Sequence, residues 1–565
     1  HLQVALHPTP CSSASPMETL ATLARRRVQK PLRKLLQIYL VVAGIHSLQK
    51  LLSSWLRAWR WRRTLKAVPK ARGAEHPVMG HILSLIGNRK RVHDWRNENT
   101  VGLPISKELA PIWSDMGNIL IIRDPVAIRH FLKDSYGKYT KSLPQEDVYF
   151  HYLRKFLGHG IFTALHGDAA PDGGHLWMQQ RKIATQIFSR SNFNRNMREV
   201  FVAKAHHCSA QLVAGEVVDM QLLFFNFTMD SIMRIFFGCE SDLLGGASND
   251  YAQAYDVAHR IFFEYAVTSL PRHQVLRFLP WPFGGFGLAA ELCQLCSPLY
   301  WRFRKALRTL DVESRKLVAK CRKDPALADR NDLLALFVQA EGKQHFSTAW
   351  LRDMVLNFVI AGRDTTACSL SWMFYIFATH PELQARAAEE VARTHPTGTD
   401  PTLQSVAADR MPVLHGLLYE TLRLYPPVPF DVKQCFFEDV LPDGTPVPRN
   451  TILAFVPYSM GRDPAVYPDP EVVRPERWIP FTAPPPHEFP VFQAGPRICL
   501  GMEMAIFEAK VVAVVLLRDW SFTLKAGEAE KIHYSAMLTM SICNSKEQDS
   551  HSLLLVPQRR DPLEK

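Results

Sequence analysis

Apolar residues recur at helical spacing along most of the chain from about residue 80 onward. The longest such stretches predict helices over residues 196–213, 249–268, 298–322, 347–379, 381–394, 410–424 and 501–518. Residues 347–379 are apolar around the whole circumference, which predicts a helix buried inside the protein. The aliphatic residues 119–123 predict a strand, and the Asp124-Pro125 pair after them opens a further helix.

The pattern changes after Pro426, where short strands and turns replace long helices. No linker interrupts residues 80–565, and no sequence repeats at a period of 20–50 residues, which excludes a solenoid or a propeller. The sequence therefore predicts one large domain over residues 71–565 that is mainly α-helical with a small β lobe. Residues 1–70 form a separate N-terminal segment.

Positive charge is concentrated in that N-terminal segment. Residues 1–70 hold thirteen Lys and Arg residues and a single acid, Glu18, so they carry almost all of the net charge of +13. The remaining chain is close to neutral. A basic tail on a neutral body indicates targeting or membrane contact and argues against a nucleic-acid partner.

The same segment contains a mostly apolar stretch from Leu35 to Leu56, whose uninterrupted part ends at Ile45. A full membrane span needs about 20 apolar residues, so this stretch is short for one. Trp55, Trp59 and Trp61 alternate with arginines, as is typical of a segment at the level of lipid headgroups. We expect a membrane anchor, with a second apolar contact at residues 278–286. The alternative is an organelle transit peptide in residues 12–27, and Met17 is a candidate start.

The ten cysteines are scattered along the chain. Only Cys293 and Cys296 have CxxC spacing, and no second pair completes a zinc site. The body is therefore predicted to be reduced and intracellular, without a disulfide framework.

One cysteine stands in a glycine-bounded loop directly before a predicted helix. Phe492, Gly495, Arg497, Cys499 and Gly501 have the spacing FxxGxRxCxG. A thiolate ligand needs a lowered pKa, which a helix N-terminus and a neighbouring Arg can supply. The two glycines would let the backbone approach a flat macrocycle closely. Backbone N–H groups around the sulfur would tune its electron donation.

These five positions resemble the haem-binding loop of the cytochrome P450 superfamily. The resemblance covers about residues 75–560, because the other motifs of the family follow in order. It implies the cytochrome P450 fold, with Cys499 as the axial ligand of the iron in haem b. The activity it implies is that of a haem-thiolate monooxygenase, which inserts one oxygen atom from O2 into an apolar small molecule.

Three charged residues resemble the family's structural network. Glu420 and Arg423 match the ExxR pair, and their spacing places both side chains on one helix face. Arg477 supplies a second arginine. In the family these three charges are buried together and support the haem loop.

The segment Ala361–Thr366 resembles the oxygen-activating motif of the family's central helix. Thr365 is expected to hydrogen-bond within the helix and to open it locally beside Gly362. Asp364 is expected to relay protons to the bound oxygen. An N-cap is the alternative for this Asp-Thr-Thr sequence, but helical patterning continues on both sides of it.

Trp177 and Arg181 match the family's WxxxR helix, which binds a haem propionate together with Arg497. Ring and guanidinium N–H groups are suitable donors for a carboxylate. The loop before this helix departs from the family pattern, because residues 165–175 carry an insertion.

Further segments resemble the plant, algal and fungal fatty-acid omega-hydroxylase clan. They are residues 180–182, Arg363, residues 425–431, residues 439–444 and residues 460–462. This likeness implies hydroxylation of a long-chain fatty acid at or near the omega carbon. The glycine-rich residues 283–287 depart from the clan, which often has basic residues there.

Such a substrate needs a long apolar tunnel with its end held near the iron. The candidate lining residues are Phe358, Val359, Pro429, Phe430, Met537 and Leu538. A carotenoid or sterol hydroxylase is the alternative at the level of substrate. The intact Asp364-Thr365 pair argues against a hydroperoxide isomerase or lyase, and the complete set of haem contacts argues against a non-catalytic lipid-binding protein.

No flavin or nicotinamide domain is visible in the sequence. The resemblance therefore implies that NADPH electrons arrive through a separate NADPH–cytochrome P450 reductase. It also implies the endoplasmic reticulum membrane, with the body facing the cytosol, and the chloroplast is the alternative.

Overall fold

The protein is described by a computed structural model. The described residues are 16–114, 118–142, 148–167, 170, 172–188, 197–276, 278, 294–341, 346–545 and 550–560, with the backbone alone at 16–32, 36, 148 and 267–276.

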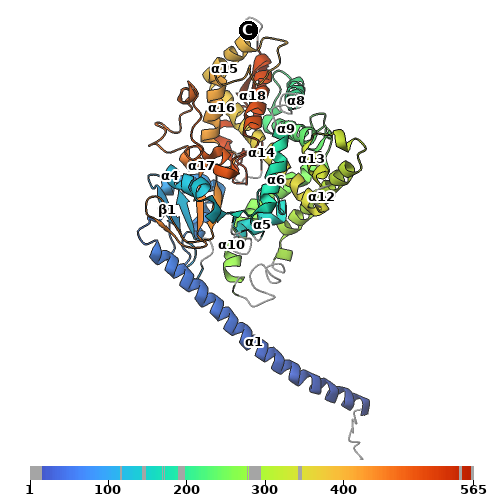
Figure 1. Ribbon diagram of the computed structural model, residues 1–565, viewed down its shortest axis with the longest axis vertical. Coiled ribbons are helices and arrows are strands. Elements are labelled where there is room, and N and C mark those ends of the chain that lie inside the picture. The colour runs from blue at the N-terminus through green and yellow to red at the C-terminus, as the bar shows by residue number, and fades with distance from the viewer. Residues whose placement is uncertain are drawn as a thin grey trace, which may run out of the picture.

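A single long helix, α14 (Thr348–Thr379), runs through the middle of the body (Figure 1). Ser347 begins it by accepting a hydrogen bond from the Trp350 N–H at 3.1 Å, as expected of an N-cap serine. Most of its side chains are buried, because it packs against α9 (Met220–Phe237), α16 (Pro412–Leu424) and α18 (Met502–Asp519). The prediction of a buried central helix over residues 347–379 is confirmed.

The other predicted helices are also present, with ends that differ from the predicted ones by up to three residues, except that α10 continues eight residues beyond its predicted end. They are α8 (Arg198–Ala210), α10 (Asp250–Leu276), α12 (Pro298–Arg322) and α15 (Pro381–Thr394). Shorter helices complete the body: α2 (Ile82–Gly87), α3 (Val92–Thr100), α4 (Pro125–Arg129), α5 (Val148–Leu157), α6 (His175–Thr185), α13 (Leu333–Ala340) and α17 (Pro457–Met460). The body is mainly helical, as the sequence predicts.

The β structure is gathered mostly in one small lobe. Its five-stranded sheet has the order β1 (Ile105–Glu108), β2 (Ile119–Ile122), β8 (Ile452–Phe455), β5 (Asp431–Cys435) and β3 (Tyr139–Thr140). Only the β2–β8 pair is parallel. A second sheet has the order β4 (Val218–Asp219), β12 (Leu554–Arg559) and β9 (Trp520–Leu524). Two small pairs join β6 (Asp439–Val440) to β7 (Pro446–Val447) and β10 (His533–Tyr534) to β11 (Ile542–Cys543).

The helix α1 (Pro16–Thr64) extends away from the β lobe into solvent (Figure 1). Residues 33–64 are long and apolar enough to cross a membrane, and their large apolar side chains up to Trp59 are mostly exposed. The end of α1 belongs to the body, because Trp61 and Leu65 are buried in the core of the β lobe. The Trp61 ring N–H donates to the Thr451 hydroxyl at 2.9 Å.

That contact corrects the prediction for Trp61, which is not a headgroup residue, whereas Trp55 and Trp59 remain exposed. The second predicted membrane contact, residues 278–286, lies outside the described residues except for Phe278. Eight of the ten cysteines are described, and all eight are free thiols. No disulfide forms among them.

Candidate functional site

Cys499 opens into a large apolar cavity between α14, α18 and α6. The helix α18 begins three residues after it, at Met502. The Cys499 backbone N–H donates to the Phe492 carbonyl at 2.8 Å, which closes the loop that carries the thiol. The cavity is walled mainly by aliphatic and aromatic side chains, with a few charged groups on one side.

The predicted cofactor residues come together around this cavity, with one exception. Trp177, Arg181, Phe492, Arg497 and Gly501 line it with Cys499. Gly495 does not line it.

Gly495 has a φ of +65° and packs against the segment His130–Asp134, where a Cβ would overlap the Leu132 carbonyl oxygen. The predicted contact of Gly495 with the macrocycle therefore has no support from the cavity lining. This glycine is required because the loop lies directly on the neighbouring backbone.

The prediction of a lowered thiol pKa is also corrected. Burial raises the pKa of the Cys499 thiol, and a hydrogen bond from the Gly501 backbone and the charge of Arg181 oppose only part of that shift. A metal ion deprotonates a coordinating thiol outright, so the raised pKa is compatible with a ligand to iron.

The charged side chains of the cavity are four cations and one anion. They are Lys141, Arg181, Lys433, Arg497 and Asp431. Asp431 accepts hydrogen bonds from Lys141 at 3.0 Å and from Lys433 at 2.9 Å, and also from Gln493. Burial lowers the pKa of Lys433 to about 7, and Asp431 opposes that effect.

The cationic side chains of this cavity outnumber its one carboxylate. A buried excess of cations is costly unless anions neutralise it. Carboxylates on a bound group would offset this excess. The donor set therefore fits a flat group that carries two carboxylates and takes a sulfur ligand, as haem does.

Thr365 lines the cavity from the middle of α14. Its hydroxyl donates to the Ala361 carbonyl at 2.8 Å, so the predicted hydrogen bond within the helix is present. The helix is nevertheless continuous from Thr348 to Thr379, without the predicted local opening. The alternative of an N-cap at this position is excluded.

Asp364 is fully buried and does not line the cavity. Its carboxylate contacts α10, where the Tyr255 hydroxyl donates to it at 3.2 Å and His259 Nδ1 lies 3.1 Å away. Arg363 donates to its other oxygen at 3.1 Å and to Asp256 at 2.7 Å.

Burial raises the pKa of Asp364, and His259 and Arg363 oppose part of that shift. The relay of protons from Asp364 to bound oxygen stays a prediction, because its carboxylate contacts α10 and does not line the cavity. A proton from Asp364 would need at least one intermediate carrier.

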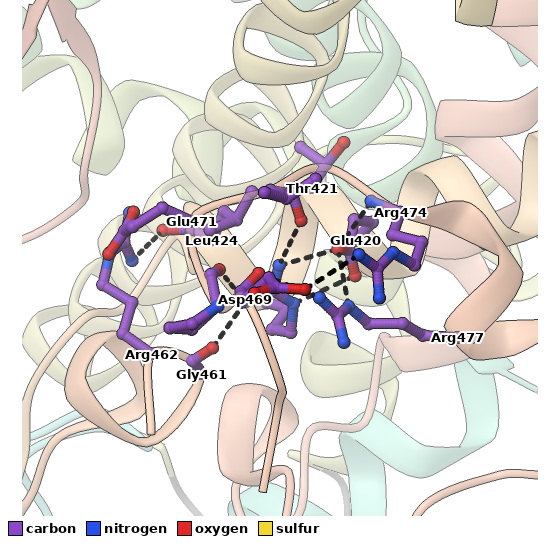
Figure 2. Close-up of polar contacts among 12 residues, drawn as sticks. Glu420, Thr421, Leu424, Gly461, Arg462, Asp469, Glu471, Arg474 and Arg477 are labelled. Carbon is purple, nitrogen blue, oxygen red and sulfur yellow. Dashed lines mark hydrogen bonds and ion pairs between the residues drawn. The ribbon is translucent and has the colours of Figure 1, made fainter. Parts of the chain in front are cut away.

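Glu420 and Arg423 form the predicted buried pair on α16. Figure 2 shows Glu420 beside Arg474 and Arg477. The carboxylate of Glu420 accepts from Arg423 at 2.6 and 2.9 Å, and both side chains are completely buried. Arg477 joins the pair at 3.3 Å, as the resemblance implies. The ring N–H of Trp478 donates to the same carboxylate at 2.9 Å, a contact that the sequence motifs did not predict.

Arg423 also connects α16 to the segment that precedes the Cys499 loop in the sequence. It donates to the carbonyls of Gly461 and Pro470, each at 2.6 Å. The buried side-chain donors and acceptors of this network all have hydrogen-bond partners. Its members are Glu420, Arg423, Arg477 and Trp478.

Three of the six predicted substrate-lining residues, Phe358, Phe430 and Leu538, line the cavity. Pro429 does not line it, and its carbonyl accepts the Tyr458 N–H. Val359 is fully buried in the core and faces away from the cavity, and Met537 is half-buried beside it, so both predictions are wrong. Along a helix, neighbours such as Phe358 and Val359 point in directions about 100° apart, and Val359 packs into the core.

Several polar residues of the site were not predicted from the sequence. Lys141, Lys433 and Asp431 are assembled from β5 and the segment after β3, far apart in the chain. His166 contacts Arg497 from the inserted loop. No local spacing marks these residues, because tertiary structure alone brings them together.

Comparisons with known proteins agree with the geometry. The family model described as Cytochrome P450 matches residues 71–548. Among similar proteins, "Cytochrome P450 704C1" of Pinus taeda is 31% identical over 523 residues, which cover 86% of this chain and 92% of the relative. "Cytochrome P450 94C1" of Arabidopsis thaliana is 30% identical over 457 residues, covering 75% and 83%. "Cytochrome P450 704B1" of the same plant is 28% identical over 533 residues, covering 87% and 96%.

Proposed function

The chain belongs to the cytochrome P450 family, whose members bind haem through a cysteine thiolate, use O2 and receive electrons from a redox partner, and we propose that it is a monooxygenase that hydroxylates long-chain fatty acids at or near the omega carbon. One observation carries the proposal. Cys499 and Thr365 line one apolar cavity whose charged groups are confined to a single cationic cluster.

The proposed cofactor is haem b. Arg497, Trp177 and Arg181 would bind one propionate, and Lys141 and Lys433 the other, because these are the donors that line the cavity. When bound, the haem supplies the activation of O2 and the transfer of one oxygen atom to the substrate. The chain itself orients the substrate, excludes water and holds protons near Thr365.

Thr365→Ala tests the role of that hydroxyl. The variant should retain haem but lose coupling, so that electrons from NADPH end in peroxide or water. Product formed per NADPH should fall by about 100-fold, the lower end of what a positioned proton donor contributes. The matched control is Ser371→Ala, which removes a similar hydrogen bond to a helix carbonyl, 2.7 Å long, at a residue that does not line the cavity.

Unchanged coupling in Thr365→Ala would show that another group delivers the protons. Recovery of coupling in Thr365→Ser would assign the effect to the hydroxyl, because this variant restores it without the methyl group.

The substrate is proposed from the apolar lining and from the clan resemblance. Phe430 lines the cavity beneath the Arg96 guanidinium, which lies 4.2 Å from the centre of its ring. The one acidic side chain that lines the cavity, Asp431, is paired with Lys141 and Lys433. A terminal methyl is harder to oxidise than the neighbouring methylenes, so the walls must restrict access sterically. Phe430→Ala should therefore move oxidation inward along the chain.

Product analysis with a reductase and a series of fatty acids measures this shift. The matched control is Phe437→Ala, a partly exposed phenylalanine near the end of β5 that does not line the cavity. A carotenoid or sterol that gives a spin shift and product, where fatty acids give neither, would overturn the fatty-acid assignment and leave the monooxygenase intact.

We further propose that α1 anchors the protein in the endoplasmic reticulum membrane and that NADPH–cytochrome P450 reductase supplies the electrons. Support comes from the exposed apolar residues of 33–56 and the basic residues at both ends of that stretch. The chloroplast remains the alternative location, which import with cleavage near Arg27 would establish.

The buried residues at the end of α1 limit how much of the N-terminal segment can be deleted. Removing residues 1–56 should release much of the protein from membranes with its haem bound, as cell fractionation and a carbon monoxide spectrum would measure. Removing residues 1–66 should also lower the yield of folded protein, because it deletes Trp61 and Leu65 from the core of the β lobe. Complete retention of the first variant on membranes would contradict anchoring by α1.

A further inference from the structure

His166 lies where the inserted loop before α6 meets the Cys499 loop. It is 1% exposed, and its ring stacks on Tyr136 with 3.8 Å between the ring centres. Its backbone N–H donates to the Thr140 hydroxyl at 3.0 Å. Gly174 packs so closely that a Cβ there would lie 2.9 Å from the Cα of His166. The imidazole is therefore held in one place by its surroundings.

The guanidinium of Arg497 contacts this imidazole. Its Nε donates to His166 Nδ1 at 2.9 Å, and its two terminal nitrogens donate to the carbonyls of Ile161 at 3.2 Å and Ala164 at 2.6 Å. A guanidinium has five N–H donors, so these three contacts leave two N–H groups, and the Tyr136 hydroxyl is a further hydrogen-bonding neighbour of the guanidinium. Arg497 lines the cavity, and two such N–H groups can bind a carboxylate.

The contact defines the protonation of His166. A guanidinium can only donate, so Nδ1 accepts and the proton sits on Nε2, 3.3 Å from the Tyr136 carbonyl. Burial and the charge of Arg497 lower the pKa of His166 to about 2. The ring therefore offers a neutral acceptor to a buried cation at every physiological pH.

We propose that His166 is a positioning residue that fixes the guanidinium of Arg497 for binding a carboxylate of the cofactor. Without the acceptor at Nδ1, the Nε–H of Arg497 would have to donate to another acceptor. The plane of the guanidinium would then rotate. This inference deepens the proposed function and rests on it. It concerns the loop at residues 165–175, where the sequence departs from the family pattern.

Three substitutions of His166 separate positioning from packing. His166→Asn keeps a carbonyl oxygen near the place of Nδ1, His166→Gln moves its amide to the place of Nε2, and His166→Leu removes the acceptor at similar volume. The measurements on each full-length holoprotein are the midpoint reduction potential of the haem iron and the rate of haem transfer to apomyoglobin.

His166→Leu should lose haem about tenfold faster, a factor that corresponds to about 1.4 kcal/mol. Its potential should fall, because a carboxylate that is less well neutralised favours the ferric state. His166→Asn should restore both quantities, and His166→Gln should not. In an Arg497→Lys background, which lacks the Nε donor, His166→Leu should have no further effect.

Equal potentials and haem-loss rates in wild type and His166→Leu would overturn the proposal. So would His166→Asn behaving as His166→Leu, or additive effects of His166→Leu and Arg497→Lys. Reduced thermal stability at an unchanged potential would assign His166 a packing role instead. A wild-type protein that binds no haem would contradict the proposed function itself, which is a separate result.

Discussion

Cys499→Ala should abolish the thiolate-type Soret band of the reduced carbon monoxide complex, and monooxygenase activity with it. Cys499 is the one cysteine among the described residues that lines the cavity. Thiolate ligation pushes electron density toward bound oxygen and favours O–O cleavage, so a haem without this ligand lacks that contribution. The spectrum and the product yield measure the two effects separately.

Cys368→Ala is the matched control. Cys368 is buried on α14, three residues after Thr365, but does not line the cavity. The control should keep the band and most of the activity, with a small loss of stability from the space that the sulfur leaves. A thiolate-type band in Cys499→Ala would mean that another cysteine ligates the iron, and the site would have to be reassigned.

Helical patterning predicted the scaffold well, for a physical reason that α14 illustrates. A buried helix must be apolar on all sides, and residues 347–379 show this directly in the sequence. The Cys499 loop was equally visible, because ligand, glycines and arginine are all local. Motif spacing also placed Glu420 and Arg423 on one face of α16, and the structure pairs them.

The sequence was least informative where the direction of a side chain depends on packing. Asp364 and Thr365 are neighbours on α14, yet the first contacts Tyr255 and His259 on α10 and the second lines the cavity. Gly495 was assigned to the cofactor because it is a glycine near Cys499, whereas its packing against Leu132 explains it. In each case the deciding neighbour is distant in the sequence, so no local pattern could identify it.

The direction of the pKa shift of Cys499 was also not predictable from the local sequence. The helix N-terminus and the neighbouring arginine were visible in the sequence and would lower the pKa. Burial, which raises it, depends on the whole fold and is the larger effect.

Glu420→Gln should cost about 3–5 kcal/mol of stability, the usual range when one member of a buried ion pair is removed. The amide would leave the charge of Arg423 uncompensated, and its NH2 group would face N–H donors that now have an acceptor, including the Trp478 ring and the Arg474 backbone. Proteins of this kind have only about 5–15 kcal/mol of net stability, so much of the folded population should be lost.

The yield of haem-bound protein and the midpoint of denaturant unfolding measure this loss. Glu476→Gln is the matched control, since it makes the same chemical change in the adjacent segment Pro475–Trp478. Glu476 pairs with Arg386 at 2.6 Å, but both side chains are about half exposed, so the control should cost less than about 1 kcal/mol. Equal stability of the two variants would show that the Glu420 network does not support the Cys499 loop, and the loop's stability would then have to come from its own packing against Leu132.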